Sequence, residues 1–270
     1  MKKKLLALVL ALCLLVTVAA VYAEETMHTV PSVTLLSNGG SILMDGGDED
    51  DYEMSFSAVA MEPGQAFGET LGLDRIIAMS KDGKMFVGWT LYDVFELETS
   101  ETCVEEEGTL CFELFEDYHM VLRSYTAHNE LLSTQKLAEY VCGECDYVVA
   151  ATWMTAEEYL AFVKEQSDAI KTSLEQDPLT QTDMNQKSEA LRTLWDEALN
   201  LLLDEAIKLL PEAEAAQLMA EQGTWKTDVE AAAEAAGKEF EGGSMYPLIV
   251  NTEAARLIEE RVYKLYELLK

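Results

Sequence analysis

Four cysteines are the residues of this chain whose type and spacing best suit chemistry beyond packing. Cys142 and Cys145 form a Cys-x-x-Cys pair, and Cys103 and Cys111 flank a Glu-Glu-Glu-Gly stretch typical of a hairpin turn. Such thiols form disulfides in exported proteins, bind zinc when two knuckles meet, and exchange disulfides where a helix begins at the pair. Disulfides within each couple are our first interpretation, a structural zinc site the second and redox catalysis the third.

Motifs of familiar enzymes are missing from the sequence. It has no Gly-x-Ser-x-Gly elbow, no phosphate-binding loop and no His-Glu-x-x-His helix. Its histidines, His28, His119 and His128, are scattered through the first half, and their spacing suits no recognised triad. Pairs of carboxylates do not identify a catalytic site, because a chain with 50 acidic residues contains many such pairs. The sequence therefore predicts a protein that is not an enzyme and needs no cofactor.

The charge balance excludes several classes of partner. Fifty Asp and Glu residues stand against 19 Lys and Arg, which gives a formal net charge of −31. A surface of that sign repels nucleic acid and anionic lipid, and it attracts basic proteins. The densest acidic run, residues 45–51, is compatible with calcium binding, but it lacks the spacing of an EF-hand and we interpret it as a solvated turn.

The N-terminus has the pattern of a secretory signal peptide. Lys2, Lys3 and Lys4 precede an apolar run that ends in Val21-Tyr22-Ala23. A charged start, a short apolar stretch and a small-residue exit predict cleavage after Ala23. Residues 1–23 are therefore the expected signal peptide, and we expect a secreted or extracytoplasmic protein with no stable membrane anchor. Its oligomeric state is left open.

Two parts with different periodicities must position these residues. Residues 24–152 show short runs with near two-residue alternation, broken by turn signals such as Asp82-Gly83, which predicts a hairpin between the flanking runs. They predict an antiparallel β-rich domain, a sandwich or a small barrel. Residues 153–270 switch to helical spacing after the capping-box pattern at Thr155 and Glu158. They predict an all-α bundle of about four helices, so the fold class is α+β.

Residues 196–268 begin with the pattern Asp196-x-x-Leu199-Asn200 and include a Gly-Gly-Ser-Met-x-Pro-Leu string between two helices. Over this range the chain resembles the N-terminal domain of the LprI lysozyme inhibitor family. The chain departs from the family at Ala233 and Glu253, where cysteines are common, and at Ile258, where threonine is usual. The signature residues that match are Asp196, Leu199, Asn200, Trp225, Gly242, Gly243, Ser244, Pro247 and Arg261.

Each signature residue has a structural interpretation that we prefer to a role in binding. Trp225 is expected to anchor the core, and the glycines to allow a tight turn. Ser244 is expected to cap the last helix. Arg261 is expected to pair with a carboxylate such as Asp196 or to face a partner.

Three functions follow from these observations. The resemblance implies a secreted acidic binding protein that blocks a basic, lysozyme-like cell-wall hydrolase, and the charge suits such a partner. The alternative is a non-inhibitory extracytoplasmic envelope module with an unknown ligand. A hydrolase that uses carboxylates of the β-rich half is the third hypothesis.

Overall fold

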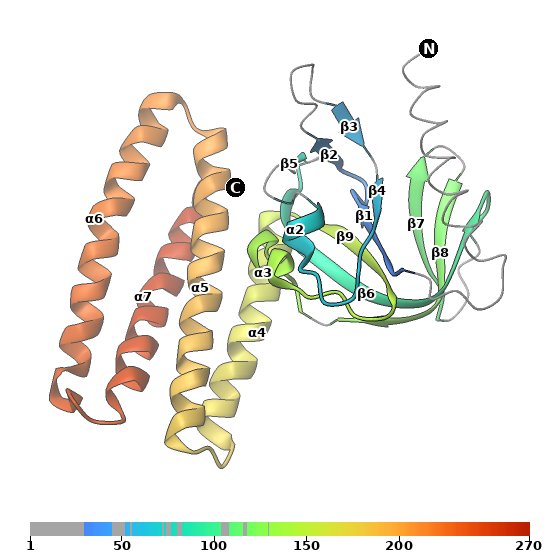
Figure 1. Ribbon diagram of the computed structural model, residues 1–270. Helices are drawn as coiled ribbons and strands as arrows, with labels where there is room; N and C mark the ends of the chain where they lie inside the picture. Colours follow the sequence, from blue (N-terminus) through green and yellow to red (C-terminus); the bar gives the residue numbers. More distant parts are fainter. Residues whose placement is uncertain are drawn as a thin grey trace. The chain divides into compact units, whose positions relative to one another are not determined.

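The computed structural model describes residues 30–44, 52–54, 56–71, 73, 77–79, 83–103, 108–115, 118–128 and 130–270. The expected signal peptide, residues 1–23, and the acidic run at residues 45–51 lie outside this part. The chain divides after Trp153 into two compact units, a β-rich unit and a helical unit (Figure 1). The class is α+β, as the sequence predicts.

The β-rich unit contains two sheets. The larger has the strand order β4-β1-β9-β6-β8-β7 and the smaller the order β3-β2-β5. Most pairings are antiparallel, as expected, but β1 and β9 run parallel, so the large sheet is mixed. The bounds of the strands are β1 Ser32–Leu36, β2 Ser41–Met44, β3 Tyr52–Met54, β4 Phe56–Ala60, β5 Ile77–Met79, β6 Met85–Ser100, β7 Leu110–Phe115, β8 Tyr118–Ala127 and β9 Asp146–Met154.

The predicted hairpin around Asp82-Gly83 is wrong. Strand β5 pairs with β2 in the small sheet, whereas β6 lies between β9 and β8 in the large one. Gly83 does take the positive φ of 71° that made it a turn signal. Gly83 therefore has the backbone conformation of a turn, but β5 and β6 pair with strands that are distant in sequence and not with each other.

Two apolar clusters pack on the two faces of the large sheet. Leu35 and Val149 belong to one cluster, whereas their chain neighbours Leu36 and Val148 belong to the other. Successive residues of a strand point to opposite faces, so both faces are buried along these strands. The short helices α2 (Phe67–Leu71) and α3 (Thr134–Glu139) contribute to the first cluster through their buried apolar side chains.

Four long helices form the second unit, as predicted. They are α4 Ala156–Gln176, α5 Gln181–Leu209, α6 Glu212–Gly237 and α7 Tyr246–Leu268, and the 3-10 turn η2, Lys238–Phe240, follows α6. The expected capping box at Thr155 is present with both of its hydrogen bonds, and Thr180 forms a second one. None of the described helices is both long enough and apolar enough for a membrane span.

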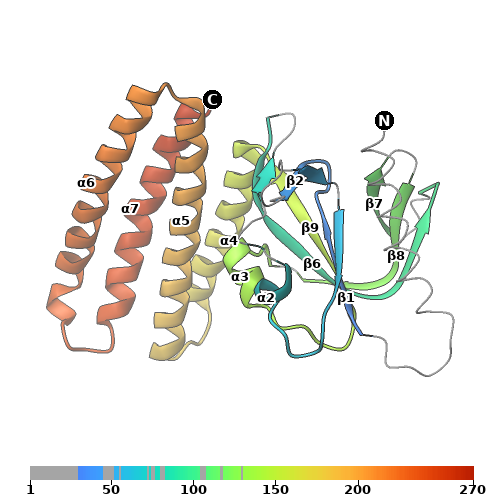
Figure 2. The ribbon, with the colours of Figure 1, turned by 45° about the horizontal axis from the view of Figure 1, so that its top comes forward.

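Helix α7 packs along both α5 and α6, and α4 packs along α5 (Figure 2). The close approach of α6 and α7 depends on Gly237, since a Cβ there would lie 2.5 Å from Val250 Cγ2. Helix α6 buries only the stripe Ala215, Leu218, Val229, Ala233 and Gly237. The rest of α6 faces solvent or is half-buried, which leaves an outer face free on this unit.

Candidate functional site

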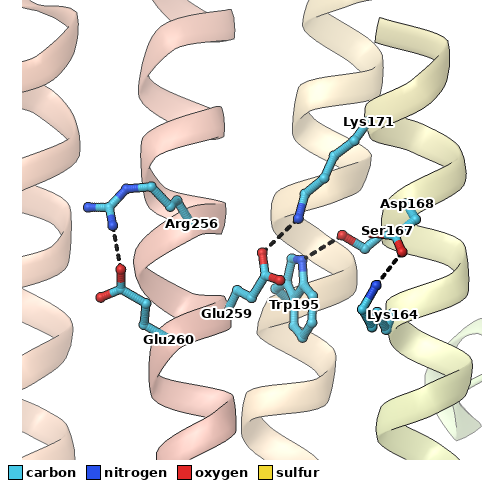
Figure 3. A network of polar contacts seen from close by, with 8 residues as sticks. All are labelled: Lys164, Ser167, Asp168, Lys171, Trp195, Arg256, Glu259 and Glu260. Carbon is cyan, nitrogen blue, oxygen red and sulfur yellow. Dashed lines mark hydrogen bonds and ion pairs between the residues drawn. The ribbon is translucent and has the colours of Figure 1, made fainter. Parts of the chain in front are cut away.

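The centre of the helical unit is a polar seam around Trp195, which is fully buried (Figure 3). The indole Nε1 donates to Ser167 Oγ on α4 at 3.1 Å. Lys171 Nζ lies 2.7 Å from Glu259 Oε2 on α7 and 5.9 Å from the centroid of the Trp195 ring. These contacts tie three helices together, so the seam is structural.

Trp225 and Arg261, two signature residues, meet each other between α6 and α7. The Arg261 guanidinium lies 5.8 Å from the Trp225 ring centroid, and its Nε donates to Gln222 Oε1 at 3.0 Å. The Arg261 Nη2 atom is buried and has no hydrogen-bond partner among the described residues. Trp225 itself is half-buried, so its ring packs against the arginine and is not the core anchor that we expected.

The expected pairing of Arg261 with Asp196 does not occur. Asp196 lies instead 3.7 Å from Arg192 Nε, and the same arginine also pairs with Glu230. Burial raises the pKa of the Asp196 carboxyl even though Arg192 opposes the shift. The other two signature residues of α5 divide between the faces of the helix, because Leu199 is buried and Asn200 is exposed.

The signature glycines shape the turn between α6 and α7. Gly242 has a φ of 76°, which favours glycine, and the Gly243 N–H donates to the Phe240 carbonyl at 2.9 Å. Ser244 does not cap α7: the cap position falls on Met245, with no side-chain bond. The Ser244 carbonyl instead accepts from Asn185 Nδ2 at 3.0 Å, and Pro247 stands in the first turn of α7.

This turn also presents apolar side chains to solvent. Phe240 is 37% exposed and Met245 is 42% exposed, and residues 238–245 are exposed throughout. We name residues 238–245 the tip segment. Two large apolar side chains on a turn shaped by glycines suit insertion into a partner.

Carboxylates surround the tip segment and line the outer face of α6. From residue 212 to 245 the chain carries eight acidic residues and two lysines. Among the described residues, only Glu230 of these acids forms an ion pair, so most of the charge is uncompensated locally. The eight are Glu212, Glu214, Glu221, Asp228, Glu230, Glu234, Glu239 and Glu241.

The cysteines only partly follow the expected pairing. Cys103 and Cys111 form a disulfide with a Cα–Cα separation of 6.2 Å. Cys142 and Cys145 are free thiols, which corrects our prediction of a second bond. The Cys142 side chain is buried, with its sulfur near the Met61 carbonyl, so it points into the core. Within the described ranges, no group of three or more potential ligands is placed to hold a metal ion.

Sequence reasoning missed several contacts that the fold creates over long distances. His128 Nε2 lies 2.9 Å from Asp93 Oδ1, and the His128 ring meets the Tyr140 ring edge-on. The Trp195–Ser167 bond was equally unforeseen. The only advance signal was the helical spacing that placed Trp195 on an apolar face.

Comparison with known proteins bears on the helical unit alone. By its fold, the C-terminal unit is an acidic bundle of four helices with a glycine turn between α6 and α7. Residues 173–265 match the family model described as the lysozyme inhibitor LprI. This confirms the resemblance and extends it to the end of α4, whereas the β-rich half has no family match. No curated protein and no solved structure matches the chain.

The LprI family consists of inhibitors rather than enzymes. Its members bind lysozyme and are extracytoplasmic. Residues 173–265 of the helical unit are therefore similar to a family of lysozyme inhibitors.

Proposed function

We propose that this chain is an exported binding protein that inhibits a basic, lysozyme-like cell-wall hydrolase and has no catalytic role of its own. The match of residues 173–265 to the lysozyme inhibitor family is the observation that carries the proposal. The formal net charge of −31 supports it, because a cationic enzyme is steered toward an acidic surface. Loss of residues 1–23 would remove three lysines and no acid, so export would make the chain more acidic still.

The tip segment and the outer face of α6 are the surface that we assign to the partner. Phe240 and Met245 supply apolar contact, and the flanking Glu239 and Glu241 supply charge opposite to that of the enzyme. Apolar anchors ringed by polar residues are the usual anatomy of an interface that binds tightly. The backbone hydrogen bonds from the Gly243 N–H to the Phe240 carbonyl and from the Tyr246 N–H to the Gly243 carbonyl fix the turn that carries these side chains, and a preformed backbone reduces the entropy cost of association.

A turbidity assay on bacterial cell walls tests the proposal. The full chain is added to a cationic lysozyme at low and at physiological ionic strength. Any strongly acidic protein attracts a basic enzyme at low salt, where exposed charges interact over about 30 Å, against about 8 Å at physiological salt. A specific inhibitor also buries apolar surface, so we expect its inhibition to persist at physiological salt. An unrelated protein of similar negative charge is the control, and equal inhibition by that control contradicts the proposal.

Variants locate the contact surface. Phe240→Ser combined with Met245→Ser is expected to weaken inhibition at least about tenfold, the effect of losing roughly 1.4 kcal/mol of binding free energy. The matched control is Leu209→Ser, because Leu209 is 70% exposed and is the last residue of α5, near the start of α6 and away from the tip segment. A control that loses as much inhibition as the double variant contradicts the assignment of the surface.

The same assay addresses the non-inhibitory envelope module. The β-rich half has a core of its own and no family match, which favours a second, unrelated recognition role for that unit. Tight binding to cell-wall material or to the hydrolase, without any loss of hydrolase activity, would make that module the better account.

A further inference from the structure

The beginning of α5 and the tip segment lie at the same end of the helical unit (Figure 2). Asn185 of α5, which lies outside the family signature, joins them: its Nδ2 donates to the Ser244 carbonyl at 3.0 Å. We propose that Asn185 is the positioning residue of the tip segment and sets the conformation that the partner binds. This inference rests on the proposed function and adds a residue of a different helix to the binding surface.

The tip segment depends on this contact because its other hydrogen bonds are local. Within the described residues, they run inside the turn or to the adjoining ends of α6 and α7. The Glu241 N–H donates to the Lys238 carbonyl at 3.3 Å, and the Tyr246 N–H donates to the Gly243 carbonyl at 3.2 Å. Such bonds shape the turn but do not fix it relative to α5. The bond from Asn185 does so.

The Asn185 amide is oriented by its own helix. Its Oδ1 accepts from Gln181 Nε2 at 3.0 Å, and the Asn185 carbonyl accepts from Oγ of the buried Ser188 at 2.8 Å. Each amide nitrogen therefore faces an oxygen, and the opposite orientation would set two oxygens against each other at the Ser244 carbonyl. Gln181 directly follows Thr180, whose capping box fixes the first turn of α5. A defined donor is thus aimed at the tip segment before a partner binds.

The bond acts on the backbone that carries the two apolar side chains of the tip segment. Ser244 directly precedes Met245, and the Gly243 N–H donates to the Phe240 carbonyl at 2.9 Å. Both apolar side chains are exposed, so their positions depend on the backbone beneath them. A backbone that is already ordered leaves less entropy to be lost on association, which strengthens binding.

The substitution Asn185→Asp isolates this bond. The carboxylate has the shape of the amide and still accepts from Gln181, but it cannot donate to the Ser244 carbonyl. The position lies near the positive N-terminal end of α5, where a negative charge does not weaken a helix. The added charge alone would favour a basic partner. Weaker inhibition by this variant therefore runs against the electrostatic expectation and reports the lost bond.

The first measurement needs no partner. Amide hydrogen exchange of the full chain reports the order of the tip region through the N–H groups of Gly243 and Tyr246, which are hydrogen-bonded within the turn. In Asn185→Asp we expect these two amides to exchange about three- to tenfold faster, the effect of losing one hydrogen bond. Amides in the middle of α7 should keep their rates. Unchanged exchange at Gly243 and Tyr246 overturns the proposal.

The second measurement is the turbidity assay with a cationic lysozyme at physiological salt. Asn185→Asp and Asn185→Ala are each expected to weaken inhibition about three- to tenfold. The matched control is Gln186→Glu, which adds the same charge at the neighbouring, exposed position and keeps the bond. This control should inhibit at least as well as the wild type. Equal inhibition by Asn185→Asp and by the control overturns the role of Asn185.

A combined variant separates positioning from a general loss of stability. Once Phe240→Ser and Met245→Ser have removed the apolar contacts, Asn185→Asp should weaken inhibition no further, because the bond has nothing left to position. A further loss of the same size means that Asn185 acts elsewhere, and it overturns the proposal. A wild-type chain that does not inhibit contradicts the proposed function instead, and the exchange rates then still decide whether Asn185 orders the tip segment.

Discussion

Replacement of Trp195 is the sharpest test of how the helical unit is held together. The side chain is fully buried, and its Nε1 is bonded to Ser167, which is itself fully buried. Trp225 is half-buried and lies at the edge of α6 under Arg261. We therefore expect Trp195→Ala to destabilise this unit far more than Trp225→Ala, although only Trp225 belongs to the family signature.

The expected loss for Trp195→Ala follows from two effects. Truncation of a buried tryptophan costs about 3–5 kcal/mol through lost transfer free energy and the cavity left behind. The Ser167 hydroxyl also loses its indole partner in the interior, a penalty of about 1–3 kcal/mol. For Trp225→Ala we expect about 1–2 kcal/mol, because a half-exposed ring gives up less buried area and one cation–π contact.

Urea denaturation followed by far-ultraviolet circular dichroism measures these losses. If Trp195→Ala fails to fold, Trp195→Phe combined with Ser167→Ala in a double-mutant cycle isolates the hydrogen bond. The two single changes each leave one buried polar group unpaired and the double change leaves none, so we expect a coupling of about 1 kcal/mol. A loss below about 1 kcal/mol for Trp195→Ala, or a larger loss for Trp225→Ala, would refute the reasoning.

Three further predictions concern other parts of the chain. Export should cleave after Ala23, so mass spectrometry of the secreted protein should find Glu24 at the N-terminus, and an intact Met1 would contradict this. Residues 153–270 alone should show helical circular dichroism and a cooperative urea transition, and a gradual melt would count against an independent unit. Burial raises the pKa of Asp196 above its ordinary 3.8, so its ionised form weakens the fold at neutral pH. Asp196→Asn should therefore raise the midpoint of urea unfolding at neutral pH. This gain should shrink as the pH falls through the raised pKa toward 3.8. A lower midpoint of the variant at neutral pH would contradict the argument.

Local signals made the helical unit readable from sequence. The capping box at Thr155 is decided by residues a few positions apart, and the structure has it. Which tryptophan is buried is a different matter. Helical spacing places Trp195 and Trp225 alike on apolar faces, but α5 packs against α4 and α7 whereas α6 packs chiefly against α7. Burial therefore follows from neighbours that one sequence does not specify.

The β-rich unit was less readable because its pairings are long-range. Val33 of β1 lies opposite Tyr147 of β9 in a parallel pair, across more than a hundred intervening residues. No local pattern encodes such a partner, whereas the Asp82-Gly83 signal was strong and still misled. The cysteines divide in the same way. Cys103 and Cys111 sit at either side of one turn and bond as expected, but the state of Cys142 depends on the core that β1 and β9 build.

Ala233 has a consequence for how this protein can be made. It is fully buried at a position where the family often carries a cysteine, and the helical unit contains no cysteine. Its maturation therefore needs no oxidising catalyst, and it should reach its native state in a reducing cytosol as readily as outside the cell. The β-rich unit, with the Cys103–Cys111 bond, depends on the compartment. Expression in the two compartments should thus yield molecules that differ in one unit only.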